Sequence, residues 1–110
     1  MNQIEIFVPT TSDVSNACDT SAWLDAAKKL VSNLFGGFTV YETSGGYVAH
    51  NGDLIEEKIF VVTSFTSAKK AKRYHGIVRG FCRNMARELG QESVMLRNIP
   101  VNAVEFVTVD

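Results

Sequence analysis

The chain has 110 residues, of which 45% are hydrophobic and 21% charged, and its formal net charge is −1. This size and composition are typical of a single globular domain (1–110) with its own core, and they argue against a disordered chain. No run of about 18 apolar residues is present, so the sequence predicts no membrane span. The first nine residues lack the basic start of a signal peptide, and Cys18 and Cys82 lie far apart, so we expect reduced thiols and a cytoplasmic location.

The first predicted elements are a strand and a helix. Residues 3–8 (QIEIFV) place Ile4, Ile6 and Val8 at alternate positions, which is typical of a half-buried strand. After a polar loop over 10–20, apolar residues recur at helical spacing up to Phe35. Gly36-Gly37 follows, and glycine is the residue that most often ends a helix in the left-handed conformation.

The middle of the chain reads as a set of hairpin strands. Residues 38–43 are predicted as a strand, Ser44-Gly45-Gly46 as its turn, and residues 47–50 as a short strand. Asn51-Gly52 is the strongest hairpin signal in the chain, because both residue types tolerate positive φ. Residues 55–65 are then predicted as the longest strand.

The third region is a basic amphipathic helix predicted over 66–91. Helical spacing of about 100° per residue gathers one apolar stripe, made of Ala71, Tyr74, Val78, Phe81, Cys82, Met85 and Leu89. The opposite side carries Lys69, Lys72, Arg73, Arg79, Arg83 and Arg87 around Gly76 and Gly80. Residues 66–90 hold seven Lys or Arg against the single acid Glu88, so this segment is +6 and the rest of the chain is −7. Residues 93–99 and 101–109, separated by Pro100, are predicted as final strand material.

The predicted element order is β-α-β-β-β-α-β(β), which favours an α+β fold: a ferredoxin-like sandwich with an antiparallel sheet and two helices on one face. The other face is then expected to carry Phe7, Tyr41 and Phe60. An uncovered face of this kind is commonly closed by a second copy, so we expect a homodimer.

Several short segments carry a resemblance. They are IEIFVP (residues 4–9), LFGGFT (34–39), the step Gly46-Tyr47, the acid Glu57 before the long strand, and GQES (90–93). In this order the chain resembles a family of small, uncharacterised bacterial and phage proteins. The resemblance implies a ferredoxin-like domain and assigns no chemistry. Relatives tend to have Trp where this chain has Tyr47, which implies a shared aromatic role.

The basic face of the predicted helix is the candidate binding site, with the residues Arg73, Gly76, Arg79, Gly80, Arg83 and Arg87. Glycine inside a helix costs roughly 0.8–1 kcal/mol relative to alanine, so two of them on a solvent face suggest close approach of a partner. Arginine binds phosphate and carboxylate groups bidentately. We therefore predict a non-enzymatic protein that recognises or sequesters a small anionic ligand of the nucleotide type.

Two other functions stay open. The same face suits a protein–protein adaptor or inhibitor that binds an acidic partner. Alternatively, the chain is a small dimeric α+β-barrel enzyme that uses Tyr41, His50 or Glu57 in a pocket over the open sheet face. Long nucleic acid is not expected as a partner, because the sequence pI is about 6.1.

Metal and cofactor motifs are missing from the sequence. There is no CxxC or HExxH spacing, so no metal site is predicted. The Gly-Gly pairs do not open a helix after a strand as a phosphate loop does, so no cofactor is expected. His75 falls at the edge of the apolar stripe and is predicted to be a structural, hydrogen-bonded histidine.

Overall fold

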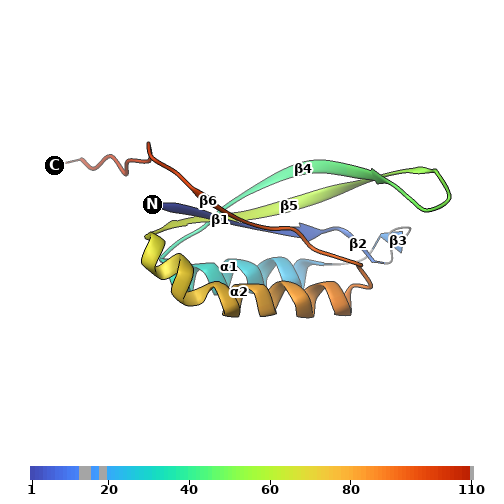
Figure 1. Cartoon of the computed structure of the whole chain (residues 1–110), viewed down its shortest axis with the longest axis horizontal. Coiled ribbons are helices and arrows are strands. Elements are labelled where there is room, and N and C mark those ends of the chain that lie inside the picture. Colours follow the sequence, from blue (N-terminus) through green and yellow to red (C-terminus); the bar gives the residue numbers. More distant parts are fainter. Residues whose placement is uncertain (13–15, 18–19, 110) are drawn as a thin grey trace.

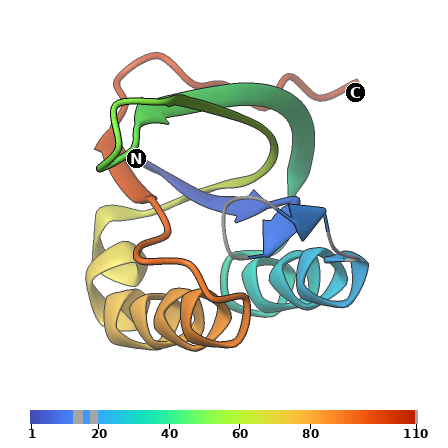
Figure 2. The ribbon, with the colours of Figure 1, turned by 90° about the vertical axis from the view of Figure 1, so that its right-hand side faces the viewer.

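The structure is a computed structural model, and it describes residues 1–12, 16–17 and 20–109. Its main sheet has four antiparallel strands in the order β4-β5-β1-β6. These strands are β1 (Asn2–Pro9), β4 (Thr39–Val48), β5 (Leu54–Thr66) and β6 (Leu96–Pro100). Helices α1 (Ser21–Phe35) and α2 (Ala68–Glu88) lie side by side on one face of this sheet (Figures 1 and 2). The predicted ferredoxin-like sandwich is therefore confirmed.

Both helices end where the sequence places glycine. The N–H of Gly36 (φ 100°) donates to the carbonyl of Ser32 and closes α1. The α2 helix begins after Ser67, whose hydroxyl accepts a hydrogen bond from the N–H of Lys70 at 3.1 Å. At its other end Gly90 has a φ of 67°, and the N–H of Gln91 bonds to the carbonyl of Ala86. This Schellman arrangement fixes the direction in which the chain leaves the helix.

The core lies between the sheet and the two helices. Ile4, Ile6 and Val8 of β1 are buried beneath α1 and α2, as their alternation predicts. The apolar stripe of α2 is likewise buried or half-buried throughout. The prediction that Phe60 lies on the open face of the sheet is wrong. Phe60 pairs with Val8, faces the helices and packs against the core.

Two strand predictions are wrong. Ser44, Gly45 and Gly46 do not form a turn, because each pairs with a residue of β5 and β4 runs unbroken to Val48. Residues 101–109 form no strand, and the backbone N–H of Val101 donates a hydrogen bond to the carbonyl of Met1. The turn at Asn51-Gly52 is confirmed, and the side chain of Asn51 accepts a hydrogen bond from the N–H of Asp53.

The predicted polar loop over 10–20 contains a small two-stranded pairing of β2 (Thr11–Ser12) with β3 (Asn16–Ala17). Cys18 lies outside the described residues, whereas Cys82 is a buried free thiol. Among the helices of the described chain, none is long and apolar enough to cross a membrane.

The molecule is elongated rather than spherical. Its extents are 54 × 23 × 22 Å and its radius of gyration is 15.1 Å, against about 13 Å for a compact chain of this length. The β4–β5 hairpin projects from one end and the C-terminal segment from the other (Figure 1).

Candidate functional site

The β4–β5 hairpin extends well beyond its neighbour in the sheet. Pairing of β1 with β5 ends at Pro9 and Ile59, whereas pairing of β4 with β5 continues to Val48 and Leu54. The outer half of the hairpin is therefore a two-stranded arm without a third strand beside it. The cavity described below lies next to this arm.

Two glycines of β4 allow atoms of β5 to approach closely within the arm. A Cβ atom added to Gly46 would lie 2.6 Å from the backbone oxygen of Ile55, so no side chain fits there without movement. A Cβ atom at Gly45 would lie 3.0 Å from Cδ1 of Ile59. Glycine inside a strand commonly marks such a close backbone approach. The Gly-Gly pair thus shapes the arm and does not terminate the strand.

A cavity of about 360 Å³ lies between the arm and the connection from α2 to β6. Its lining includes Tyr47 from β4, Glu57 from β5, and Gln91, Glu92 and Ser93 from the connection. We call it the hairpin cavity. Gly46-Tyr47, Glu57 and residues 91–93 are far apart in sequence and meet at this one place.

Smaller recesses continue the hairpin cavity. One of about 280 Å³ is lined by Tyr47, His50 and Glu92, and one of about 60 Å³ by Phe7, Glu57 and Met95, among others. The polar groups around these spaces are carboxylates, a phenol, an imidazole, an amide and a hydroxyl. This set can accept and donate hydrogen bonds to a polar small molecule, and Tyr47 adds an aromatic face.

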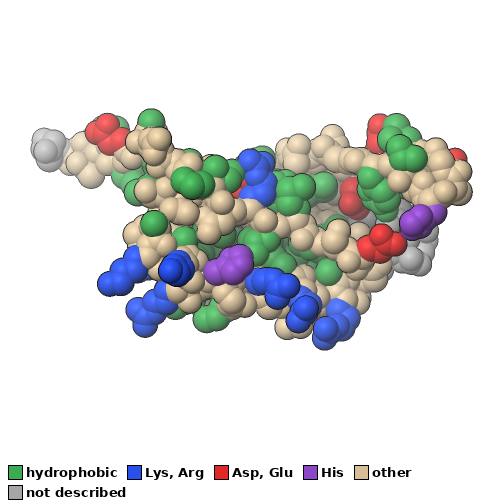
Figure 3. Space-filling view, viewed as in Figure 1, with side chains coloured by type: hydrophobic (Ala, Val, Ile, Leu, Met, Phe, Trp, Pro, Cys, Tyr) green, Lys and Arg blue, Asp and Glu red, His purple; other side chains and the backbone are tan. Residues whose placement is uncertain are grey.

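A second cavity follows the basic side of α2. It measures about 570 Å³, and we call it the arginine groove. His75, Arg79, Arg83 and Arg87 line one wall at intervals of four residues, and residues 91–94 with Leu96 line the other. Successive members of this row lie about 6 Å apart along the helix axis. Figure 3 shows the Lys and Arg side chains gathered along α2.

The predicted site residues divide into two groups. Arg79, Arg83 and Arg87 lie together in the arginine groove, whereas Arg73 lies outside it, 5.3 Å from the ring of Tyr74. Gly76 and Gly80 also lie outside the lining. A Cβ atom at either glycine would meet nothing within 4 Å, so both leave bare backbone on the open side of the helix.

The cations of α2 have no acidic partners among the described residues, whose ion pairs join Lys28 to Asp25, Lys58 to Glu42 and Arg97 to Glu5. The arginines of the groove therefore form no ion pair with a described residue. His75, predicted to be a structural, hydrogen-bonded histidine at the edge of the apolar stripe, is exposed and lines the groove.

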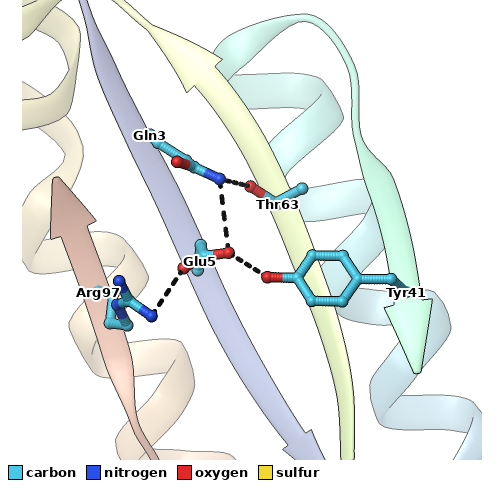
Figure 4. Close-up of polar contacts among 5 residues, drawn as sticks. All are labelled: Gln3, Glu5, Tyr41, Thr63 and Arg97. Atoms are coloured by element: carbon cyan, nitrogen blue, oxygen red, sulfur yellow. Dashed lines mark hydrogen bonds and ion pairs between the residues drawn. The ribbon is translucent and has the colours of Figure 1, made fainter. Parts of the chain in front are cut away.

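A third polar cluster lies at the centre of the open sheet face (Figure 4). The carboxylate of Glu5 is only 2% exposed; it accepts a hydrogen bond from the hydroxyl of Tyr41 at 2.5 Å and pairs with Arg97 at 3.5 Å. The amide of Gln3 donates to Glu5 at 3.5 Å and to the hydroxyl of Thr63 at 3.2 Å. The hydrogen bond that Tyr41 donates to Glu5, together with burial and the negative charge of Glu5, raises the pKa of Tyr41 above its usual value.

Glu5 is a member of this cluster that the sequence did not predict. The only local signal was an acid between two isoleucines of a predicted strand, and its partners Tyr41 and Arg97 come from other strands. The cluster crosses the sheet and has its polar groups paired, so we interpret it as a structural link between β4, β1 and β6. Among the described residues, no group of three or more His, Cys, Asp or Glu residues is placed to hold a metal ion.

Comparison with known proteins gives structural neighbours only. No known family and no curated protein matches the sequence. A phage SAM lyase in complex with S-methyl-5'-thioadenosine superposes with a TM-score of 0.61 at 18% identity, over 88% of this chain and 78% of that one. A phage SAM lyase in the apo state gives 0.57 at 17% identity, over 94% and 92%.

The third neighbour is a Bacillus cereus protein related to NIF3, with a TM-score of 0.58 at 14% identity. It covers 93% of this chain, but this chain spans only 26% of that larger protein. At these identities the neighbours establish the shared α+β fold. Small-molecule binding and enzymatic proteins are thus both built on the fold of this chain.

Proposed function

We propose that this protein binds a small nucleoside-type molecule in the hairpin cavity. The observation that carries the proposal is the convergence of Tyr47, Glu57 and residues 91–93 from three distant segments around one space of about 360 Å³. Small-molecule sites in proteins typically measure about 300–1,000 Å³ and combine an aromatic or apolar wall with a few polar groups. The neighbour that holds S-methyl-5'-thioadenosine supports a nucleoside as the ligand class.

The chemistry of the lining suits such a ligand. Tyr47 offers a face on which a base or a sulfonium group can rest. The carboxylates of Glu57 and Glu92 accept hydrogen bonds from hydroxyl and amino groups, and they attract a positive centre. Because acids outnumber bases in this lining, we propose a neutral nucleoside thioether or a cationic sulfonium nucleoside rather than a nucleotide as the occupant of the hairpin cavity itself.

The test is calorimetric titration of the purified protein with S-methyl-5'-thioadenosine and with SAM (S-adenosylmethionine). We expect Glu57→Gln to weaken binding by about 10-fold or more, because a hydrogen bond to a charged group contributes about 1.5–3 kcal/mol. Tyr47→Ala should weaken it similarly. The control is Asp25→Asn on α1, which also removes one carboxylate charge but does not line the cavity.

Unchanged affinity in both Glu57→Gln and Tyr47→Ala would contradict the proposal. Chromatography of the same mixtures after incubation measures turnover. We expect binding without turnover, in line with the sequence prediction of a non-enzymatic protein. Release of a new nucleoside thioether from SAM would instead favour the enzyme alternative. In that case Glu57 and His50 remain candidates, while the hydroxyl of Tyr41 is already bonded to Glu5.

A second candidate function is recognition of a small anionic, nucleotide-type ligand on the basic face of α2. The observation that favours it is the arginine groove, in which Arg79, Arg83 and Arg87 have no ion-pair partner among the described residues. The test is a thermal shift with micromolar nucleotide, which Arg83→Glu should abolish. An acidic protein partner would instead co-purify with the wild type and dissociate as the salt concentration rises.

We also propose that the protein is a homodimer. The open sheet face and the two projecting ends leave apolar side chains in water, among them Val48, Leu54 and Phe106, which is 68% exposed. Light scattering coupled to size-exclusion chromatography tests this state, and a monomer at micromolar concentration would contradict it. The cytoplasmic location stays a prediction of the sequence.

A further inference from the structure

The hairpin cavity and the arginine groove share one wall. Gln91, Glu92 and Ser93 line both cavities, because the chain leaves α2 at Gly90 and runs between them toward β6. The Schellman bond from the N–H of Gln91 to the carbonyl of Ala86 holds the start of this segment against the last turn of α2. Only a short stretch of chain therefore separates the two spaces.

The two cavities carry opposite charge. The hairpin cavity is lined by Glu57 and Glu92 and by no Lys or Arg. The arginine groove is lined by three arginines and His75, with Glu92 as the one acid in its wall. In the space-filling view the cationic side chains along α2 and the acidic side chains next to the hairpin lie on the same face of the molecule (Figure 3).

We infer that the two cavities form one bipartite site for a nucleoside whose 5' substituent ends in an anionic group. The inference rests on the proposed function, since the nucleoside occupies the hairpin cavity. The substituent then crosses residues 91–93, and its anionic end lies against the arginines of the groove. A guanidinium fork binds a carboxylate or a phosphate bidentately, so these are the two end groups that fit.

The geometry of the arginine row supports an extended end group. Arg79, Arg83 and Arg87 span about 12 Å of helix, given a rise of about 1.5 Å per residue. Arg87 stands nearest in sequence to the shared wall, so we expect it and Arg83 to make the first contacts with the anionic end. Glu57 lines the hairpin cavity but not the arginine groove and repels an anion, which favours placing that end beyond the wall on the α2 side rather than in the hairpin cavity.

The experiment compares two matched pairs of probes by calorimetric titration at low salt. Adenosine and adenosine 5'-diphosphate differ by the phosphate end. S-methyl-5'-thioadenosine and S-adenosylhomocysteine are both thioethers and differ by an amino-acid end that carries a carboxylate. We expect the member with the phosphate or carboxylate end to bind about 10-fold more tightly in at least one pair, and the pair concerned identifies the end group.

Variants then show which residues cause the gain in affinity. Arg83→Gln combined with Arg87→Gln should bring the anionic probe to within about twofold of its neutral partner and leave the neutral probe unchanged. The matched control is Lys72→Gln combined with Arg73→Gln, which also removes two positive charges from the same helix but outside the groove. Tyr47→Ala should weaken both members of the pair by a similar factor, because the nucleoside is common to them.

Two results would overturn the inference. The first is equal affinity within both pairs, which would mean that the hairpin cavity binds the nucleoside and the arginine groove does not bind the end group. The second is an anionic probe that is sensitive to the arginines and indifferent to Tyr47→Ala, which would show two separate sites. Failure of the proposed function looks different, since then S-methyl-5'-thioadenosine and adenosine do not bind at all.

Discussion

Replacing Gly76 and Gly80 by alanine should stabilise the protein, and the size of the effect follows from the structure. Both glycines lie inside α2, and neither has the positive φ seen at Gly36, Gly52 and Gly90. An added Cβ atom meets nothing within 4 Å at either position, so there is no steric cost. Alanine is about 0.8–1 kcal/mol more favourable than glycine in a helix interior, which gives roughly 1.6–2 kcal/mol for the pair.

Urea unfolding followed by circular dichroism measures this change. We expect the midpoint to rise with an unchanged m-value, and Tm to rise by roughly 6–16 °C for a domain of this size. The matched control is Gly36→Ala, where a Cβ atom also meets nothing within 4 Å but φ is 100°. That substitution should destabilise by about 1–2 kcal/mol, because L residues are strained in the left-handed region.

A neutral or destabilising result for the Gly76→Ala, Gly80→Ala pair would refute the reasoning, since it would mean that something contacts this side of α2. Stabilisation would show that the two glycines cost stability without any return in packing. A role in close approach of a ligand or partner to the helix would then be the explanation to test, by titrating the stabilised variant with the same probes.

Three further predictions concern single residues. Tyr41→Phe should leave Glu5 with one fewer donor and lower the free energy of unfolding by about 1–3 kcal/mol at neutral pH. The raised pKa of Tyr41 stabilises the folded state below about pH 10, and this contribution is lost as pH rises through the folded-state pKa. In urea titrations, wild-type stability should therefore fall more steeply above pH 10 than that of the variant. Burial raises the pKa of the Cys82 thiol to about 11. Peptide mass spectrometry should therefore find Cys82 unmodified by iodoacetamide at pH 8 in the native protein and modified in urea. Rapid labelling of the native protein would contradict its burial. Gly46→Ala should destabilise the protein by about 1–3 kcal/mol, because the added Cβ atom would lie 2.6 Å from the backbone oxygen of Ile55. Gly37→Ala should not, because its Cβ atom would meet nothing within 4 Å. Equal stability of the two variants in urea would disprove the close approach.

Local chemistry determined much of this fold from the sequence alone. The periodicity of α2, the glycine after Phe35 and the Asn51-Gly52 turn depend on neighbours within about four residues, and each was predicted close to its observed place. The basic face of α2 was also predictable from local sequence, because helical geometry by itself brings Arg79, Arg83 and Arg87 onto one side.

Tertiary structure decided the rest. Gly45-Gly46 has the composition of a turn, and only pairing with Glu57 and Glu56 across the hairpin makes it strand. The burial of Glu5 depends on Tyr41 and Arg97, which come from other strands. The hairpin cavity likewise needs β4, β5 and the connection after α2 to meet. Such contacts join residues tens of positions apart, and their free energy comes from packing and cross-strand pairing that short-range propensity does not contain.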